Sequence, residues 1–148
     1  MVNLREINNG NFNDVISLSV FEEQKEFVAS NTYSLAQAKV YPECKPLAIY
    51  NDDTLVGFVM YGTDSDDNNE NWISRLMIDR KYQKMGYGKA AMECVMSIIM
   101  SDKEHDKVYI SFEPENTGAK ILYEQFGFIP DGRVLEGEIV YCFTYGHK

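Results

Sequence analysis

The sequence contains few residues of the kinds that bind metal ions or form disulfide bonds. Its 148 residues include only two histidines and three cysteines, and the cysteines Cys44, Cys94 and Cys142 lie far apart. Structural zinc sites need a close group of ligands, and a disulfide framework needs an even number of cysteines. We therefore expect no metal site, and we interpret the cysteines as ordinary small side chains.

Long hydrophobic runs are also missing. The longest apolar stretch, around residues 94–100, is much shorter than the ~20 residues that a membrane-spanning helix needs. The first residues enter an alternating strand pattern directly and lack the basic and apolar regions of a signal peptide. We therefore expect a cytoplasmic protein without a membrane span.

Basic residues are the minority among the charged ones. The chain has 14 lysines and arginines against 23 aspartates and glutamates, a formal net charge of −9 at pH 7. A field of this sign repels phosphate backbones and attracts cations, so it disfavours nucleic acid and favours a small cationic substrate. Net negative charge also keeps a small protein soluble, and charge alone does not separate these explanations.

Apolar residues are sufficient for one packed domain. Hydrophobic residues make up 45% of the chain, whose length is close to that of a typical domain, so we expect a single domain over residues 1–148. The patterns predict an α/β (α+β) fold with a mixed, mainly antiparallel central sheet flanked by helices. The predicted strands are 2–7, 47–50, 54–61, 72–78, 108–112 and 139–145. The predicted helices are one capped by Asp14, 34–40, 89–100 and one from Asn116 or Thr117 to Gly127, and residues 62–71 are expected to be a polar turn.

A glycine-containing segment connects the strand at 72–78 to the helix at 89–100. Without a Cβ atom, Gly86 and Gly88 allow backbone N–H groups to approach an anion closely. The helix that follows adds the partial positive charge of its N-terminus. Two glycines before a helix can equally be a simple turn, and no Walker lysine follows them. The segment is therefore a candidate diphosphate site that needs support from elsewhere in the chain.

A second group of functional side chains lies about thirty residues further on. Asn116, Lys120 and Tyr123 are four and three residues apart, so a helix would place them on one face. An amide, an ammonium group and a phenol together could bind and protonate a ligand. Alternatively, Tyr123 could be a core aromatic residue beside Leu122 and Phe126.

Together these two segments resemble the cofactor motifs of the GNAT superfamily of N-acetyltransferases. Gln83-x-x-Gly86-x-Gly88 is similar to the acetyl-CoA pyrophosphate signature, and the stretch from Asn116 to Phe128 is similar to the second cofactor motif. The resemblance covers essentially the whole chain, and residues 27–38 further resemble the bacterial spermine/spermidine acetyltransferase subgroup. It implies the three-layer GNAT fold and acetyl-CoA-dependent acetylation of a primary amine, with spermidine or spermine favoured.

The resemblance also implies roles for individual residues. The backbone of Met77 and Ile78 would pair with the pantetheine arm, and Asn116 would hydrogen-bond it. Lys120 would lie near the phosphates, and Tyr123 would protonate the departing thiolate as general acid. The diphosphate would be held by Gln83, Lys84, Met85, Gly86, Tyr87, Gly88 and Lys89.

The resemblance does not supply a proton acceptor. Several polyamine acetyltransferases use a glutamate on the fourth strand where this chain has Ser74, which cannot act as such a base. Polyamine nitrogens are mostly protonated near neutral pH, so some group must remove a proton. The acidic candidates are Glu22, Glu23, Glu26 and Glu138. Each could act through water, hold a distant ammonium group or simply face solvent. Tyr33 and Tyr41 could line the same groove through cation–π contacts or serve in packing.

Other functions are compatible with parts of this pattern. The acceptor could be another small amine, an aminoglycoside or a peptide N-terminus. A non-catalytic CoA-binding module would keep the glycine segment but would not need Asn116 and Tyr123. A domain that binds another phosphate compound would show no preference for acetyl-CoA. The resemblance further implies a homodimer formed through the final strands.

Overall fold

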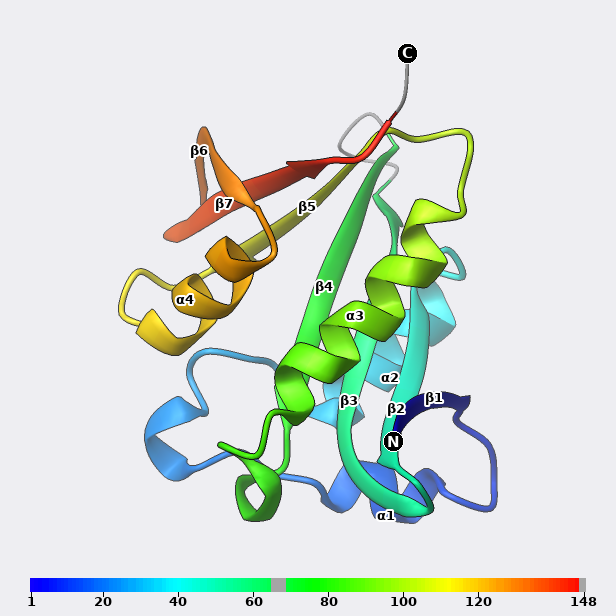
Figure 1. The fold of residues 1–148 in the computed structure, drawn as a ribbon. Helices are drawn as coiled ribbons and strands as arrows, with labels where there is room; N and C mark the ends of the chain where they lie inside the picture. Colours follow the sequence, from blue (N-terminus) through cyan, green and yellow to red (C-terminus); the bar gives the residue numbers. More distant parts are fainter. Residues whose placement is uncertain (65–68, 147–148) are drawn as a thin grey trace.

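A seven-stranded sheet, in the order β1-β2-β3-β4-β5-β7-β6, runs through residues 1–64 and 69–146, the part of the chain that the computed structural model describes (Figure 1). The strands are β1 (Val2–Glu6), β2 (Lys45–Asn51), β3 (Thr54–Asp64), β4 (Glu70–Ile78), β5 (Lys107–Phe112), β6 (Ile129–Leu135) and β7 (Glu138–Thr144). The helices are α1 (Phe12–Ser17), α2 (Asn31–Val40), α3 (Tyr87–Met100) and α4 (Thr117–Gln125), with short 3₁₀ turns at Glu22–Gln24 and Arg80–Tyr82. Among these strands β4 and β5 are parallel and the other neighbours antiparallel, which confirms the predicted mixed sheet.

Helices cover both faces of the sheet, in three layers. Figure 1 shows α3 crossing in front of the sheet and α2 lying behind it. One apolar cluster joins buried residues of α3, such as Met92 and Val95, to the sheet and to Tyr123 of α4. The other contains Val15 of α1 together with Phe58 on the opposite sheet face. The sheet therefore has a core on each side, as the predicted fold class requires.

The α3 helix forms because its apolar residues recur on one face. Its buried residues form one stripe in which each has a buried neighbour three or four positions away: Ala91, Met92, Val95, Met96 and Ile99. Burying each large aliphatic side chain contributes about 1.5–3 kcal/mol to folding. This packing fixes the position of the α3 N-terminus and of the glycine segment before it.

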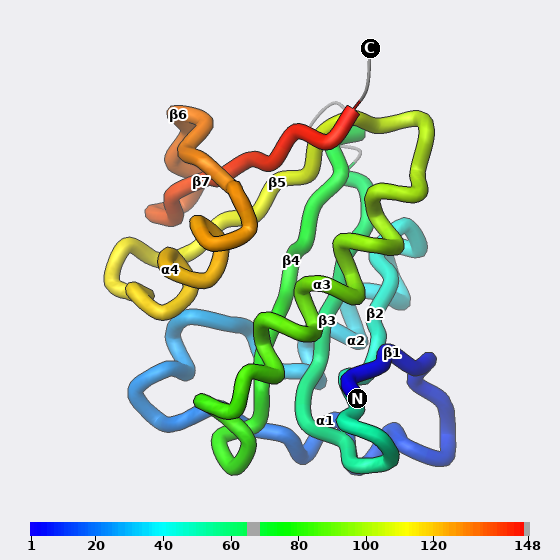
Figure 2. The backbone as a smooth tube through the Cα atoms, in the orientation of Figure 1, coloured from blue at the N-terminus to red at the C-terminus, as the bar shows by residue number. Residues whose placement is uncertain are grey.

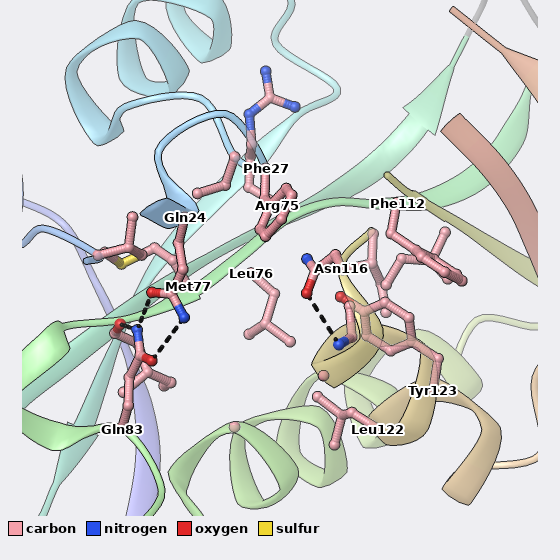
Figure 3. Close-up of a pocket in the computed structure, with 18 of the residues that line it drawn as sticks. Gln24, Phe27, Arg75, Leu76, Met77, Gln83, Phe112, Asn116, Leu122 and Tyr123 are labelled. Carbon is pink, nitrogen blue, oxygen red and sulfur yellow. Dashed lines mark hydrogen bonds between the residues drawn. The ribbon is translucent and has the colours of Figure 1, made fainter. Parts of the chain in front are cut away.

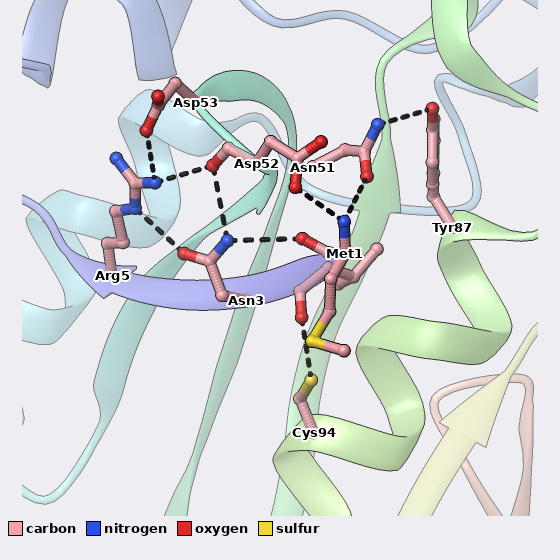
Figure 4. Close-up of polar contacts among 9 residues, drawn as sticks. Met1, Asn3, Arg5, Asn51, Asp52, Asp53, Tyr87 and Cys94 are labelled. Carbon is pink, nitrogen blue, oxygen red and sulfur yellow. Dashed lines mark hydrogen bonds and ion pairs between the residues drawn. The ribbon is translucent and has the colours of Figure 1, made fainter.

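Polar contacts tie the first strand and the start of α3 to the β2–β3 turn (Figure 4). The guanidinium of Arg5 lies 4.2 Å from the centre of the Tyr50 ring and donates a hydrogen bond to Asp53 at 2.9 Å. Asn51 donates a hydrogen bond to the hydroxyl of Tyr87 at 3.0 Å. The turn thus holds the first residue of α3 in place.

Residues 18–30 connect α1 to α2 and pass beside the end of β4. The tube in Figure 2 shows this segment running below α4. In the described residues, no helix is long and apolar enough to cross a membrane.

Three expectations from the sequence were wrong in detail. The strand β6 was not predicted, because Pro130, Asp131 and Gly132 resemble a turn, and its pairing with β7 is interrupted at these residues. Residues 62–64 and 70–71 belong to β3 and β4 rather than to a polar turn, and residues 65–68 of that turn lie outside the described part. The first helix begins at Phe12 after Asn11, so Asp14 lies in its first turn and does not cap it.

Candidate active site

The candidate site lies where β4 and β5 separate. These two strands pair at Trp72 and Tyr109, the one register pair they form in the described chain, and Figure 1 shows them diverging beyond it. On its other edge β4 pairs with β3. Tyr61 of β3 pairs with Ile73, and the next residue, Met60, pairs with Arg75, so Ser74 between them is an extra, bulged residue. The bulge and the divergence leave the edge of β4 from Ile73 to Ile78 free to line a cavity of about 340 Å³.

The glycine segment closes one end of this cavity. Gly86 has a left-handed backbone (φ 85°), Lys84 does too (φ 65°), and no side chain caps α3. A Cβ atom built on Gly86 would meet nothing within 4 Å, and one on Gly88 would lie 3.8 Å from Leu122. The first N–H groups of α3 have no partner within the helix and no side-chain cap, so they can bind an anion.

The predicted residues of this segment differ in their placement. Gln83, Lys84, Tyr87 and Gly88 line the cavity, whereas Met85, Gly86 and Lys89 are exposed beside it. Figure 3 shows the amides of Gln83 and Gln24 pairing with each other across the cavity wall, at 2.9 and 3.1 Å. Gln83 also donates to the carbonyl oxygen of Ile78 at 3.0 Å. The glycine segment is thereby tied both to β4 and to the segment before α2.

The α4 helix supplies the opposite wall. Asn116 caps the helix by accepting a hydrogen bond from the backbone N–H of Ala119 at 3.3 Å, as Figure 3 shows. Tyr123 lines the cavity and is only 7% exposed, with its ring 5.6 Å from that of Phe112 and 6.1 Å from that of Phe128. Lys120 is exposed and does not line the cavity. The predicted common face therefore holds for Asn116 and Tyr123 but not for Lys120.

The hydroxyl of Tyr123 forms no hydrogen bond with any described residue. Burial raises the pKa of this phenol well above its ordinary value, and the negative charge of Glu138 raises it further. Tyr123 is therefore both a core aromatic residue, as one interpretation of the sequence held, and a protonated group at the cavity wall.

A second cavity of about 730 Å³ adjoins the first. Phe27, Val28, Ser74, Arg75 and Ser111 line both cavities, so the two meet at the β4 bulge. The second cavity is rich in carboxylates, which come from Glu26, Glu43, Asp64, Glu136 and Glu138. Among the described residues, no group of three or more histidine, cysteine, aspartate or glutamate side chains could hold a metal ion.

Arg75 is the strand residue with the most polar contacts at this junction. It donates to the side chains of Ser34 and Gln37, at 3.1 and 2.9 Å, and to the carbonyl oxygen of Ser74 at 2.8 Å. Burial lowers the pKa of Arg75, while the negative charge of Glu138 opposes this change. A cation is thus fixed at the junction, in the lining of a cavity that has five carboxylates and one other basic residue, Lys25.

The predicted acceptor residues are only partly brought together. The second cavity is lined by Glu26, Tyr41 and Glu138 of the predicted residues, whereas Glu22, Glu23 and Tyr33 are exposed and line neither cavity. Sequence reasoning missed Gln24, Phe27, Arg75 and Ser111. The signal for Arg75 was available, since it is a charged residue within the otherwise apolar run of the strand.

Comparison with known proteins agrees with this geometry. Residues 4–128 match the acetyltransferase (GNAT) family. The spermine/spermidine N(1)-acetyltransferase of Bacillus subtilis is 30% identical over 138 residues, which cover 90% of this chain and 91% of that protein.

The chain belongs to the GNAT family of acetyltransferases.

Solved structures of this GNAT fold contain coenzyme A. PaiA N-acetyltransferase from Thermoplasma acidophilum, in complex with coenzyme A, superposes with a TM-score of 0.72 at 14% identity, covering 98% of this chain and 99% of that chain. Spermidine N-acetyltransferase from Vibrio cholerae, in complex with CoA and spermine, gives a TM-score of 0.73 at 16% identity, with 95% and 92% covered. At these identities the likeness shows the fold.

Acetyl-CoA is the cosubstrate of this GNAT acetyltransferase, and the cavity fits it. The uncapped α3 N-terminus suits a diphosphate, and the free edge of β4 suits an extended pantetheine arm that hydrogen-bonds like an added strand. Four exposed basic residues surround the glycine segment in a chain of net charge −9: Arg80, Lys81, Lys84 and Lys89.

Proposed function

We propose that the protein transfers an acetyl group from acetyl-CoA to a primary amine of a polyamine, most favourably spermidine or spermine. The observation that carries this proposal is the acidic second cavity, which meets the acetyl-CoA cavity at the bulge on β4. Its carboxylates can hold several ammonium groups of one extended cation at once, and its volume of about 730 Å³ leaves room for such a chain.

The relatives support the same acceptor. The Bacillus subtilis protein is named a spermine/spermidine N(1)-acetyltransferase, and the Vibrio cholerae enzyme was crystallised with spermine. In our proposal Glu26, Glu43, Asp64 and Glu136 hold the distal ammonium groups. The exposed Glu22, Glu23 and Tyr33 contribute only from outside the two cavities.

The proposed reaction is a direct attack of the neutral amine on the thioester carbonyl. A backbone N–H of β4 beside the bulge polarises the carbonyl oxygen, and Tyr123 donates its proton to the departing thiolate. The position of Tyr123 supports this role, because its side chain lines the cavity, its hydroxyl bonds no described residue, and its raised pKa keeps it protonated.

The remaining cofactor residues bind without taking part in proton transfer. The backbone of Met77 and Ile78 pairs with the pantetheine arm, and Asn116 hydrogen-bonds it from the α4 side. The segment from Gln83 to Lys89 holds the diphosphate. Lys120 can reach the phosphates only from outside the cavity, since its side chain is exposed.

A panel of amines tests the acceptor. Purified protein is mixed with acetyl-CoA and one amine, and released thiol is measured for spermidine, spermine, an aminoglycoside, a free amino acid and a peptide N-terminus. We expect the highest kcat/KM for the polyamines, by at least about tenfold over any amine with a single positive charge. Efficient turnover of an amino acid or a peptide instead would contradict the polyamine assignment. Thiol release from none of them would favour a non-catalytic CoA-binding module.

Two further features belong to the proposal. We place the protein in the cytoplasm, since its three cysteines are free, as in a reducing compartment. We also propose a homodimer that covers the edge strand β6, where Ile129 and Val134 are 65% and 64% exposed.

A further inference from the structure

Ser111 and Glu138 form a hydrogen-bonded pair at the junction of the two cavities. Ser111, on β5, lines both cavities. Glu138, the first residue of β7, lines the second, acidic cavity, which is the acceptor cavity of the proposed function. The Ser111 hydroxyl donates to Oε1 of Glu138 at 2.7 Å. The second carboxylate oxygen remains available to a ligand, and the glutamate side chain is half-buried.

The negative charge of Glu138 acts on one residue in each of two walls of the first cavity. Its negative charge raises the pKa of Tyr123 on α4, after the larger effect of burial. The same charge opposes the lowering of the Arg75 pKa by burial. The geometry agrees with this, because the hydrogen bond to Ser111 holds the carboxylate beside the junction of the two cavities.

A proton acceptor is needed at this point. An ordinary aliphatic amine is mostly protonated near neutral pH and has no lone pair until it loses a proton. Ser74, at the bulge, is a neutral hydroxyl that donates to the carbonyl oxygen of Met60 at 3.3 Å. Tyr123 is already protonated, so it cannot accept. Glu138 lines the second cavity and is hydrogen-bonded to Ser111 of the junction, so it is the carboxylate that the structure ties to this point.

We propose that Glu138, held in place by Ser111, accepts the proton of the incoming ammonium group, directly or through one water molecule. This inference rests on the proposed function. The ammonium group gives one proton to the Glu138 carboxylate, its lone pair forms the C–N bond to the acetyl carbon, and the C–S bond breaks. The thiolate takes the Tyr123 proton, the phenolate takes the remaining excess proton of the nitrogen, and Glu138 returns its proton to solvent.

Other charged groups face the acceptor cavity and bear on this titration. They are Lys25, Glu26, Glu43, Asp64, Arg75 and Glu136. The Arg75 guanidinium disfavours an ammonium group beside it, which promotes loss of a proton from the amine at this point. The remaining carboxylates attract the amine in its protonated form and deliver it to the junction.

Glu138→Gln tests the proposal, because glutamine keeps the size and the hydrogen bond from Ser111 but cannot take a proton at neutral pH. We expect kcat for spermidine at pH 7 to fall about a hundredfold, within the range that general bases contribute. The loss should shrink as pH rises and more of the amine is neutral. The Kd for acetyl-CoA and the melting temperature should stay near wild-type values, which shows that the variant is folded.

Glu136→Gln is the matched comparison. It removes a carboxylate of the same cavity, two residues away, that Ser111 does not hold. It should raise KM for spermidine and keep the wild-type pH profile of kcat. If Glu138→Gln showed this same pattern, Glu138 would only hold an ammonium group and the proposal would be wrong.

Ser111→Ala examines the positioning residue. Without the hydroxyl, the carboxylate loses its fixed orientation, and we expect kcat to fall about tenfold with an altered acid limb of the pH profile. If the wild type acetylated a polyamine and Glu138→Gln had the same kcat and pH profile as the wild type, this inference alone would be wrong. Absence of wild-type turnover with every amine would overturn the proposed function, and the inference with it.

Discussion

At the residue scale, Tyr123 combines two properties that rarely occur together. Its ring packs between Phe112 and Phe128 in the core, which fixes its direction, while its hydroxyl has no partner among the described residues. Burial disfavours the charged phenolate, so the pKa of Tyr123 rises and the phenol keeps its proton over the whole range of an enzyme assay. A rigid, protonated donor is what a general acid requires.

Tyr123→Phe removes this proton and little else. We expect kcat to fall at least about a hundredfold, while the Kd for acetyl-CoA measured by calorimetry changes less than about threefold. Because the raised pKa keeps the phenol protonated, wild-type kcat should also remain level between about pH 8 and pH 10, where an ordinary tyrosine would begin to ionise.

Tyr141→Phe is the control for this substitution. The ring centre of Tyr141 also lies close to that of Phe112, at 4.8 Å. However, the Tyr141 hydroxyl donates to Glu124, and Tyr141 lines neither cavity. Its kcat should stay close to that of the wild type. An unchanged kcat in Tyr123→Phe would remove Tyr123 from the chemistry.

At the scale of elements, the sequence predicted those whose pattern is local. The amphipathic α3, the β2–β3 hairpin and α4 between Asn116 and Gly127 all follow from short-range periodicity and capping. The strand β6 escaped prediction because only its ends, residues 129–130 and 134–135, pair with β7, and the unpaired residues between them have the composition of a turn. Strand pairing of this kind depends on partners distant in sequence, which periodicity does not register.

The same distinction applies to the site. The glycine segment and Tyr123 belong to local motifs and were predicted from them. Ser111 and Arg75 were missed because their importance arises from the divergence of β4 and β5, which brings separate strands to one junction. Glu138 was only one of several acidic candidates, because no local signal shows that Ser111 holds it.

The left-handed conformation at the α3 N-terminus gives an element-scale prediction. Gly86→Ala introduces a Cβ that meets nothing within 4 Å, so its cost comes from the positive φ of 85° and amounts to about 1 kcal/mol. Relief of this strain would turn the N–H groups of the segment away from the diphosphate. We expect the Kd for CoA, measured by calorimetry, to rise about tenfold.

Gly132→Ala controls for strain alone. Gly132 also has a positive φ (98°) and open space around its Cβ position, but it lies in β6, away from the glycine segment. Both variants should lose similar stability in thermal melts, and only Gly86→Ala should bind CoA more weakly. Equal CoA affinity in the two variants would show that the backbone of Gly86 does not shape the diphosphate site.

At the scale of the whole molecule, charge is divided between two ends of one site. Residues 80–89 contain four basic and no acidic residues, although the chain has a net charge of −9. The acceptor cavity has five carboxylates against Lys25 and Arg75. An anionic cosubstrate is thus attracted locally but repelled by the rest of the protein, whereas a cationic acceptor is attracted both by its cavity and by the net charge.

Salt should therefore affect the two substrates differently. Raising ionic strength from about 20 mM to about 300 mM shortens the Debye length to a few ångströms and screens both the local and the net charge. For CoA, loss of local attraction and loss of distant repulsion offset each other, so we expect its Kd to change less than about threefold. For spermidine both contributions are lost, and KM should rise about tenfold.

A monoamine acceptor, measured in the same thiol-release assay, should show a much smaller rise, because attraction scales with the charge of the ligand. Equal salt dependence for the monoamine and spermidine would contradict recognition of several ammonium groups by the acidic cavity, and would leave the reacting nitrogen as the single point of electrostatic contact.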